Sequence, residues 1–168
     1  MKTIFFFLLF FNMAAYAYQL EVPSESEARD FLENIPNATN PCEFYQKLHE
    51  VSTCRPKDYP LGFGKFFCEL FSKEGYPHLT SQGKDWFIQT QICLIEAAAN
   101  AVDEGHTQCR KLTRDSVNSH FGCYLNAGFC DLPHKDIAKM SQLVGRKNLT
   151  PSMLWLVLRL KLRCLVER

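Results

Sequence analysis

The 168-residue sequence lacks the short motifs that mark most enzymes. It has no G-x-S-x-G nucleophile turn and no H-E-x-x-H zinc motif. It also has no glycine-rich phosphate loop, because Gly62-Phe63-Gly64 carries neither the lysine nor the spacing of one. No pair of carboxylates stands at a spacing that suggests acid–base work. We therefore expect no enzymatic activity, no catalytic residue and no cofactor.

The chain also lacks an excess of one charge and the spacings of a metal site. Its 19 lysines and arginines face 18 acidic residues, so strong overall attraction to nucleic acid is not expected. The five histidines show no H-x3-H spacing, and no C-x-x-C pair occurs, which argues against bound metal. Weak cation binding at Asp103, Glu104 and His106 is the alternative, although such a cluster more often is a solvated helix end.

Long apolar runs are missing except at the N-terminus, MKTIFFFLLFFNMAAYAYQL. Lys2 precedes a short apolar run, and small residues follow at Ala15 and Ala17. This order is typical of a secretory signal peptide, which we assign to residues 1–17 with cleavage after Ala17. We expect no stable membrane insertion and a secreted, extracellular protein.

Eight cysteines follow the leader: Cys42, Cys54, Cys68, Cys93, Cys109, Cys123, Cys130 and Cys164. An even number of cysteines in a secreted chain predicts a disulfide framework. Cys123 and Cys130 are then most simply the ends of two different bridges, with a short loop closed between them as the alternative. Spacing alone does not choose among the possible pairings.

Residues 18–40 are polar and acidic, and we interpret them as an arm outside the core. The arm contains one short amphipathic segment, Ser24–Asn34, which is compatible with a helix. Two glycosylation sequons occur, at Asn37 and Asn148. Pro151 follows the second sequon and is expected to hinder its use.

Residues 41–168 predict a small, all-α, disulfide-stapled domain. The apolar spacing and the helix start and stop residues predict the following segments: helices at Cys42–Glu50, Lys65–Ser72, Ser81–Glu104, from Thr107 to about Tyr124 with a break near Gly122, and from Pro133 to Gly145. Arg55–Gly64, RPKDYPLGFG, is instead predicted to be a turn segment because of its prolines and glycines.

The tail at residues 154–163 carries two competing patterns. Leucine alternates with other residues, which favours a strand, whereas Thr150-Pro151 is a good helix start. We favour a helix, half-buried and tethered through Cys164. Its charges are scattered on a helical wheel, which does not fit a membrane-surface helix. A lytic or heparin-binding role for the tail's basic residues is the alternative; these are Arg159, Lys161 and Arg163.

Several motifs accompany the cysteines in a fixed order. They are Ser52-Thr53-Cys54, Ser81-Gln82-Gly83-Lys84 with Trp86 or Phe87 after it, Ile92-Cys93-Leu94, and Cys123-Tyr124 followed by Cys130. Over about residues 42–164, these motifs and their spacing resemble the stanniocalcin family of secreted glycoprotein hormones. The resemblance implies the bridges Cys42–Cys68, Cys54–Cys109, Cys93–Cys123 and Cys130–Cys164.

The sequence departs from vertebrate members of that family in its cysteines. It lacks their additional N-terminal pair, and no cysteine follows Cys164 to join two chains. A disulfide-linked dimer is therefore not expected, whereas a noncovalent homodimer is possible. The best fit is a divergent, invertebrate-type stanniocalcin-like protein.

The resemblance implies a hormone-like glycoprotein that acts by binding an extracellular protein, either a receptor or a protease. Family roles of this kind are the regulation of calcium and phosphate and the inhibition of metalloproteases. The alternative is a secreted lipid- or membrane-binding module of the saposin-like type, which is also helical and rich in cysteine. Saposin-like chains usually hold six cysteines in adjacent pairs at helix ends, a ladder that differs from this one.

Overall fold

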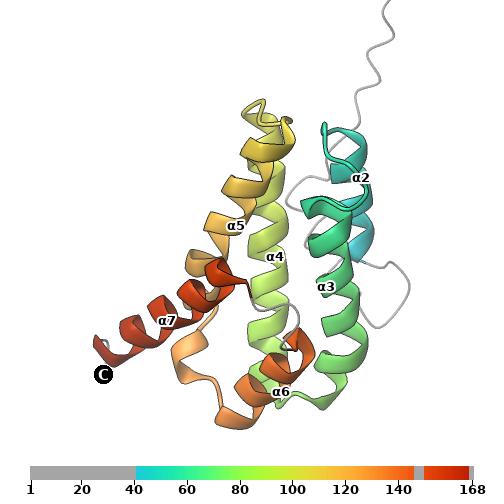
Figure 1. Ribbon diagram of the computed structural model, residues 1–168. Coiled ribbons are helices and arrows are strands. Elements are labelled where there is room, and N and C mark those ends of the chain that lie inside the picture. Colours follow the sequence, from blue (N-terminus) through green and yellow to red (C-terminus); the bar gives the residue numbers. More distant parts are fainter. Residues whose placement is uncertain (1–40, 146–149, 167–168) are drawn as a thin grey trace, which may run out of the picture.

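A computed structural model describes residues 41–145 and 150–166 (Figure 1). Within these ranges the chain is helical and forms no strand, which confirms the all-α prediction. The signal peptide, the acidic arm with Ser24–Asn34, and the sequons at Asn37 and Asn148 lie outside the described residues. The short helical turns are η1 (Pro41–Glu43), η4 (Tyr76–His78) and η5 (Phe129–Asp131), and the remaining elements are given below.

The centre of the domain is a hairpin of two helices, α4 (Ser81–Asp103) and α5 (Cys109–Asn126), which lie side by side (Figure 1). Helix α4 begins where the hydroxyl of Thr80 accepts a hydrogen bond from the Gly83 amide at 3.1 Å, and it ends before Gly105, whose φ is +78°. The predicted helix Ser81–Glu104 is thus confirmed.

Helix α5 runs without interruption through Gly122, so the predicted break there is wrong. A glycine inside a helix costs only about 1 kcal/mol, which packing readily offsets. Here the fully buried Leu112 of α5 belongs to the same core cluster as the small residues Ala98 and Ala101 of α4. The disulfide at Cys123, next to the glycine, also holds this part of the helix against α4.

A second helical arm contains α2 (Phe44–Glu50) and a continuous run of η2 (Tyr59–Lys65), α3 (Phe66–Leu70) and η3 (Phe71–Gly75). The predicted turn over Arg55–Gly64 is therefore wrong beyond Asp58. Pro60 lies in the first helical turn, where no amide donor is needed. Gly64 allows a close approach, since a Cβ there would lie 2.4 Å from the Tyr45 ring.

The C-terminal part comprises α6 (His134–Val144) and α7 (Pro151–Val166). Helix α6 follows Pro133 and ends at Gly145 as predicted, where φ is +65°. Its buried Asp136 accepts hydrogen bonds from the Thr80 amide, at 3.1 Å, and from the Thr80 hydroxyl, which fixes α6 to the start of α4.

The tail is a helix and not a strand, which confirms the choice made from Thr150 and Pro151. The Thr150 hydroxyl accepts from the Met153 amide at 3.3 Å and caps the first turn of α7. Helix α7 packs on α5 and η5, and Figure 1 shows its C-terminal end pointing away from the rest of the domain.

All eight cysteines are paired. The bridges are Cys42–Cys68, Cys54–Cys109, Cys93–Cys123 and Cys130–Cys164, the pairing that the stanniocalcin resemblance implies. The alternative of a short loop closed between Cys123 and Cys130 is thus wrong. Each bridge joins two helical elements or the segments that adjoin them. Together they staple a domain whose core is divided into two small clusters of buried apolar residues.

Candidate functional site

Helix α7 exposes a row of large apolar side chains. Leu158 and Leu162 are about half exposed, Trp155 is 59 % exposed and Leu165 is 72 % exposed. We call this surface the α7 outer face; it comprises Leu154, Trp155, Leu158, Leu162, Leu165 and Val166. Single exposed leucines are ordinary, but a contiguous row on one helix is typical of a surface that a partner covers.

The position of Leu160 explains why these residues point outward. Leu160 is 1 % exposed and, with the half-buried Leu156 and Cys164, forms the side of α7 that meets the domain. At about 100° per residue, the residues of the α7 outer face fall within an arc of roughly 120° on the opposite side. The helix is therefore apolar on two faces, of which the domain covers one.

The charges of α7 border this outer face. Between Pro151 and Val166 the sequence has three basic residues and no acidic one. On the helical wheel, Arg159 and Arg163 lie along one edge of the outer face and Lys161 lies along the other. The sequence predicts charges scattered around the helix. In the structure, the basic side chains instead border the apolar outer face on its two edges. The Arg159 guanidinium also lies 4.1 Å from the centre of the Phe121 ring, a cation–π contact that holds α7 to α5.

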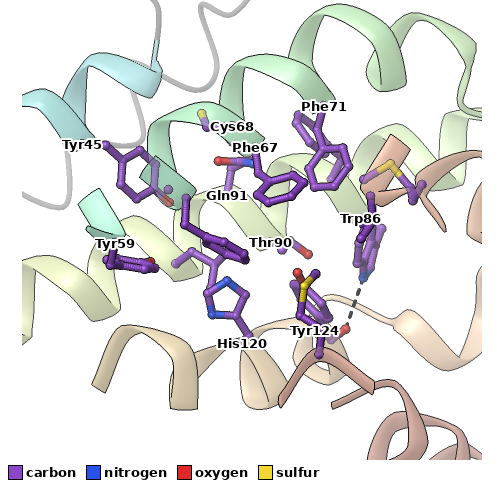
Figure 2. Close-up of a pocket in the computed structure, with 17 residues that line it drawn as sticks. Tyr45, Tyr59, Phe67, Cys68, Phe71, Trp86, Thr90, Gln91, His120 and Tyr124 are labelled. Atoms are coloured by element: carbon purple, nitrogen blue, oxygen red, sulfur yellow. Dashed lines mark hydrogen bonds between the residues drawn. The ribbon is translucent and has the colours of Figure 1, made fainter. Parts of the chain in front are cut away.

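A partly open pocket with a cavity volume of about 70 Å³ lies between the α4–α5 hairpin and the second helical arm (Figure 2). Aromatic side chains from six elements form much of its wall: Tyr45, Tyr59, Phe63, Phe67, Phe71, Trp86, Phe87 and Tyr124. The Trp86 indole donates to the Tyr124 carbonyl at 3.2 Å and packs edge-on against the Tyr124 ring. These contacts fix the rings around the space that they enclose.

Among the residues that the structure describes, two polar atoms at this cavity have no hydrogen-bond partner. They are the hydroxyl oxygen of Thr90 and the side-chain oxygen of Gln91, on adjacent residues of α4. The two side chains are only 3 % and 5 % exposed, so bulk water does not solvate them. Most buried polar atoms in proteins are hydrogen-bonded, and an unpartnered pair therefore calls for a ligand or ordered water.

The titratable groups of the cavity are neutral near pH 7. Burial lowers the pKa of His120, and its Nδ1 lies 2.7 Å from the Ser116 carbonyl, which places the proton on Nδ1. Burial raises the pKa of Tyr124 to about 12 and also raises the pKa values of Tyr45 and Tyr59. The cavity is thus suited to binding an uncharged group, since none of these phenols ionises at neutral pH.

The sequence suggests a weak cation site at Asp103, Glu104 and His106. The structure brings His106 together with Glu104 and with Asp115. The His106 imidazole lies 2.8 Å from an Asp115 oxygen and 3.7 Å from a Glu104 oxygen, so it forms ion pairs when it is protonated. Arg114 and His106 both lower the pKa of Asp115, with Arg114 giving the larger effect. No group of three ligand-type side chains suited to a metal occurs in the part of the chain that the structure describes.

Reasoning from the sequence missed the cavity because its wall is assembled from distant segments. The signal that was present is Thr90-Gln91, a polar pair inside a stretch of α4 that otherwise buries apolar side chains.

None of the helices in the described ranges is long and apolar enough to cross a membrane.

Comparison with protein-family models, with curated proteins and with solved structures found no match for this chain. Its function is therefore inferred from its own residues and their arrangement.

Proposed function

We propose that this chain is a secreted, stanniocalcin-like glycoprotein that acts by binding another extracellular protein, and not by catalysis. The α7 outer face carries this proposal. Exposed apolar surface costs about 25 cal/mol for each Å² left in water, and a partner that covers Leu158, Leu162 and Trp155 recovers that free energy.

Secretion is supported by the leader-like N-terminus and by the four disulfides, because such bonds persist in oxidising compartments. The stanniocalcin resemblance is supported by the agreement between the bridges of the structure and those that the resemblance implies. A role in calcium and phosphate regulation, or in metalloprotease inhibition, would follow from the identity of the partner.

The chemistry of α7 defines the partner's surface. Leu154, Leu158 and Leu162 recur every four residues, the spacing with which a helix places anchors in an apolar groove. Arg159 and Lys161 border the row on either side and would meet carboxylates. The expected partner is a receptor or protease with an apolar groove and an acidic rim.

The test is binding of the labelled, purified protein to cells of the source organism. We expect saturable binding that trypsin treatment of the cells abolishes. Leu158→Ser with Leu162→Ser should weaken it at least about tenfold, as expected for the loss of two anchors. The matched control is Phe66→Ser, which removes an apolar side chain that is 49 % exposed on α3 and should leave binding unchanged. Equal binding by the α7 variant would contradict the proposal.

A lipid- or membrane-binding role of the saposin-like type is the second candidate. The absence of acidic residues from α7, with Trp155 among leucines and basic residues beside them, is the observation that favours it. Vesicles of phosphatidylcholine with phosphatidylserine, sedimented at low and moderate salt, separate the two candidates. Salt-insensitive binding that the Leu158→Ser, Leu162→Ser variant loses would favour lipid.

A noncovalent homodimer is the remaining way of covering the α7 outer face. Analytical ultracentrifugation of the wild-type chain and the α7 variant would detect it as a concentration-dependent mass that the variant loses. A monomer in both proteins would leave the face available to an unlike partner.

A further inference from the structure

We propose that the Cys130–Cys164 bridge is a modification site, at which a dithiol reductant opens this bridge while the other three stay closed. The reacting group is a thiolate, supplied by a small dithiol or by a protein dithiol of the C-x-x-C type. Opening the bridge changes how α7 is held, so the site would control the α7 outer face. That consequence rests on the proposed function, whereas the reaction itself does not.

Burial decides which disulfide a reductant opens. Exchange requires a thiolate to reach one sulfur while the other sulfur leaves as a thiolate, and a thiolate is disfavoured in apolar surroundings. A bridge therefore opens readily when one end is accessible and the other end can carry a charge. Cys130 and Cys164 are both half-buried, so each is in partial contact with solvent and their bridge meets both conditions.

The other three bridges each have at least one buried end. Both Cys42 and Cys68 are buried, so a reductant does not reach their sulfurs. In Cys93–Cys123, attack at the half-buried Cys93 would expel the buried Cys123 as a thiolate. Apolar surroundings raise the pKa of a thiol, and a leaving group of higher pKa leaves more slowly.

The Cys54–Cys109 bridge is protected in two ways. Cys54 is buried, and a carboxylate oxygen of Asp58 lies 3.8 Å from the Cys109 sulfur. Attack at Cys109 would therefore expel a buried thiolate, whereas attack at Cys54 would place the leaving charge beside a carboxylate, which Coulomb repulsion opposes. Arg55 and Arg110 flank this bridge and offset part of the repulsion, but they do not change the burial of Cys54.

Positive charge beside Cys164 favours its departure as a thiolate. Arg163 directly precedes it, and Lys161 lies three residues earlier, within one turn of α7. Neighbouring lysine and arginine side chains lower the pKa of a thiol, which makes it a better leaving group. Asp131 is the acidic neighbour of Cys130, the cysteine to be attacked, and it is exposed, so salt screens its charge.

The exchange takes place in two steps that conserve electrons and protons. A thiolate of the reductant attacks the Cys130 sulfur, which breaks the bridge, forms a mixed disulfide and releases Cys164 as a thiolate that takes a proton from water. The second thiolate of the reductant then attacks the reductant's sulfur in the mixed disulfide, closes a disulfide within the reductant and releases Cys130, which is also protonated. The bridge gains two electrons and two protons, and the dithiol loses the same.

Opening the bridge leaves α7 held by noncovalent contacts alone. The buried Leu160 and the cation–π contact of Arg159 with Phe121 remain, while the covalent link across a separation of 34 residues is lost. The other bridges still join the second helical arm to the hairpin and α4 to α5. The reaction therefore loosens α7 and leaves the α4–α5 hairpin closed.

The test is stepwise reduction of the wild-type protein by dithiothreitol under native conditions. Samples taken during the reaction are alkylated, and mass spectrometry of their peptides identifies the cysteines that have reacted. We expect Cys130 and Cys164 to be alkylated together, at least about tenfold faster than any other pair. Hydrogen exchange of this product should accelerate in α7 and stay unchanged in α4.

The role of Cys164 as the leaving group is tested by Arg163→Gln. At low salt this variant should open the bridge about twofold more slowly than the wild type, and added salt should reduce the difference. Arg110→Gln is the matched control, because it removes an exposed arginine beside Cys109, a cysteine of another bridge. The control should leave the rate at Cys130–Cys164 unchanged.

Two results would overturn the proposal. If another bridge opens before Cys130–Cys164 or at the same rate, burial does not direct the reduction. If Arg163→Gln opens the bridge as fast as the wild type at low salt, the charge of α7 does not assist the departure of Cys164. Neither result bears on partner binding by the α7 outer face, which the cell-binding experiment tests separately.

Discussion

The contact between Asp136 and Thr80 predicts how strongly α6 is held to the central hairpin. Asp136 is 2 % exposed and accepts from both the amide and the hydroxyl of Thr80, while the same hydroxyl caps the Gly83 amide. Asp136→Ala removes both acceptors and leaves the half-buried Thr80 amide without its hydrogen-bond acceptor. The variant therefore weakens the first turn of α4 and the anchor of α6 together.

The magnitude follows from the number and kind of hydrogen bonds lost. Hydrogen bonds to a charged group contribute about 1.5–3 kcal/mol each, so two of them predict a loss of about 3–6 kcal/mol in the free energy of unfolding. The negative charge also lies at the N-terminus of a long helix, which adds about 0.3–1 kcal/mol. Guanidinium unfolding of the disulfide-intact protein, followed by circular dichroism, measures the sum.

Two further variants separate the cap from the charge. Asp136→Asn keeps the shape and one acceptor, and it should lose less stability than Asp136→Ala. Asp85→Ala removes an exposed carboxylate in the second turn of α4, and it should lose under about 1 kcal/mol. A loss for Asp136→Ala no larger than that for Asp85→Ala would refute this account of how α6 is anchored.

Three further predictions concern other parts of the domain. Because burial lowers the pKa of His120, the unfolded chain binds a proton below about pH 6.5 that the folded chain resists, so stability falls as pH falls below that value. His120→Gln should reduce that slope by up to about 1.4 kcal/mol per pH unit in unfolding measured between pH 7 and 5. Gly64→Ala places a Cβ against the buried Tyr45 ring and should lower the free energy of unfolding by about 1–3 kcal/mol. A Cβ at Gly122 meets no atom within 4 Å, so Gly122→Ala should raise the free energy of unfolding by about 0.5–1 kcal/mol. Thermal unfolding compares the two variants. Removing Cys130–Cys164 by a double serine substitution should cost about 4 kcal/mol from its separation of 34 residues, and hydrogen exchange should then accelerate in α7 and not in α4.

The elements that could be predicted from the sequence are those whose local signals agree with their packing. Helix α4 has an alanine-rich apolar face and a stop at Gly105, and its predicted and observed ends differ by one residue. The run from Tyr59 to Gly64 predicts a turn because proline and glycine usually mark turns, and the structure shows a helical element instead. There, Pro60 starts a helix and Gly64 makes room for Tyr45, a contact that depends on a partner distant in the sequence.

The candidate sites were harder to predict than the helices. The apolar and basic content of α7 was visible, but which face the domain covers depends on how Leu160 and Cys164 dock. The cavity depends on residues from both helical arms, and the sequence does not show how those arms face each other. Pairing of the cysteines likewise needed either a relative or a structure, since spacing alone permits many arrangements.

The order of the disulfides along the chain divides the domain covalently into two parts. The bridges Cys42–Cys68, Cys54–Cys109 and Cys93–Cys123 overlap, whereas Cys130–Cys164 encloses α6 and α7 alone. Residues 124–129 are thus the stretch between Cys42 and Cys164 that no bridge spans. An endoprotease cut elsewhere in this range leaves one covalent molecule. A single cut within 124–129 would instead leave the α7 outer face on a fragment that no covalent bond joins to α4 or to the segments before it.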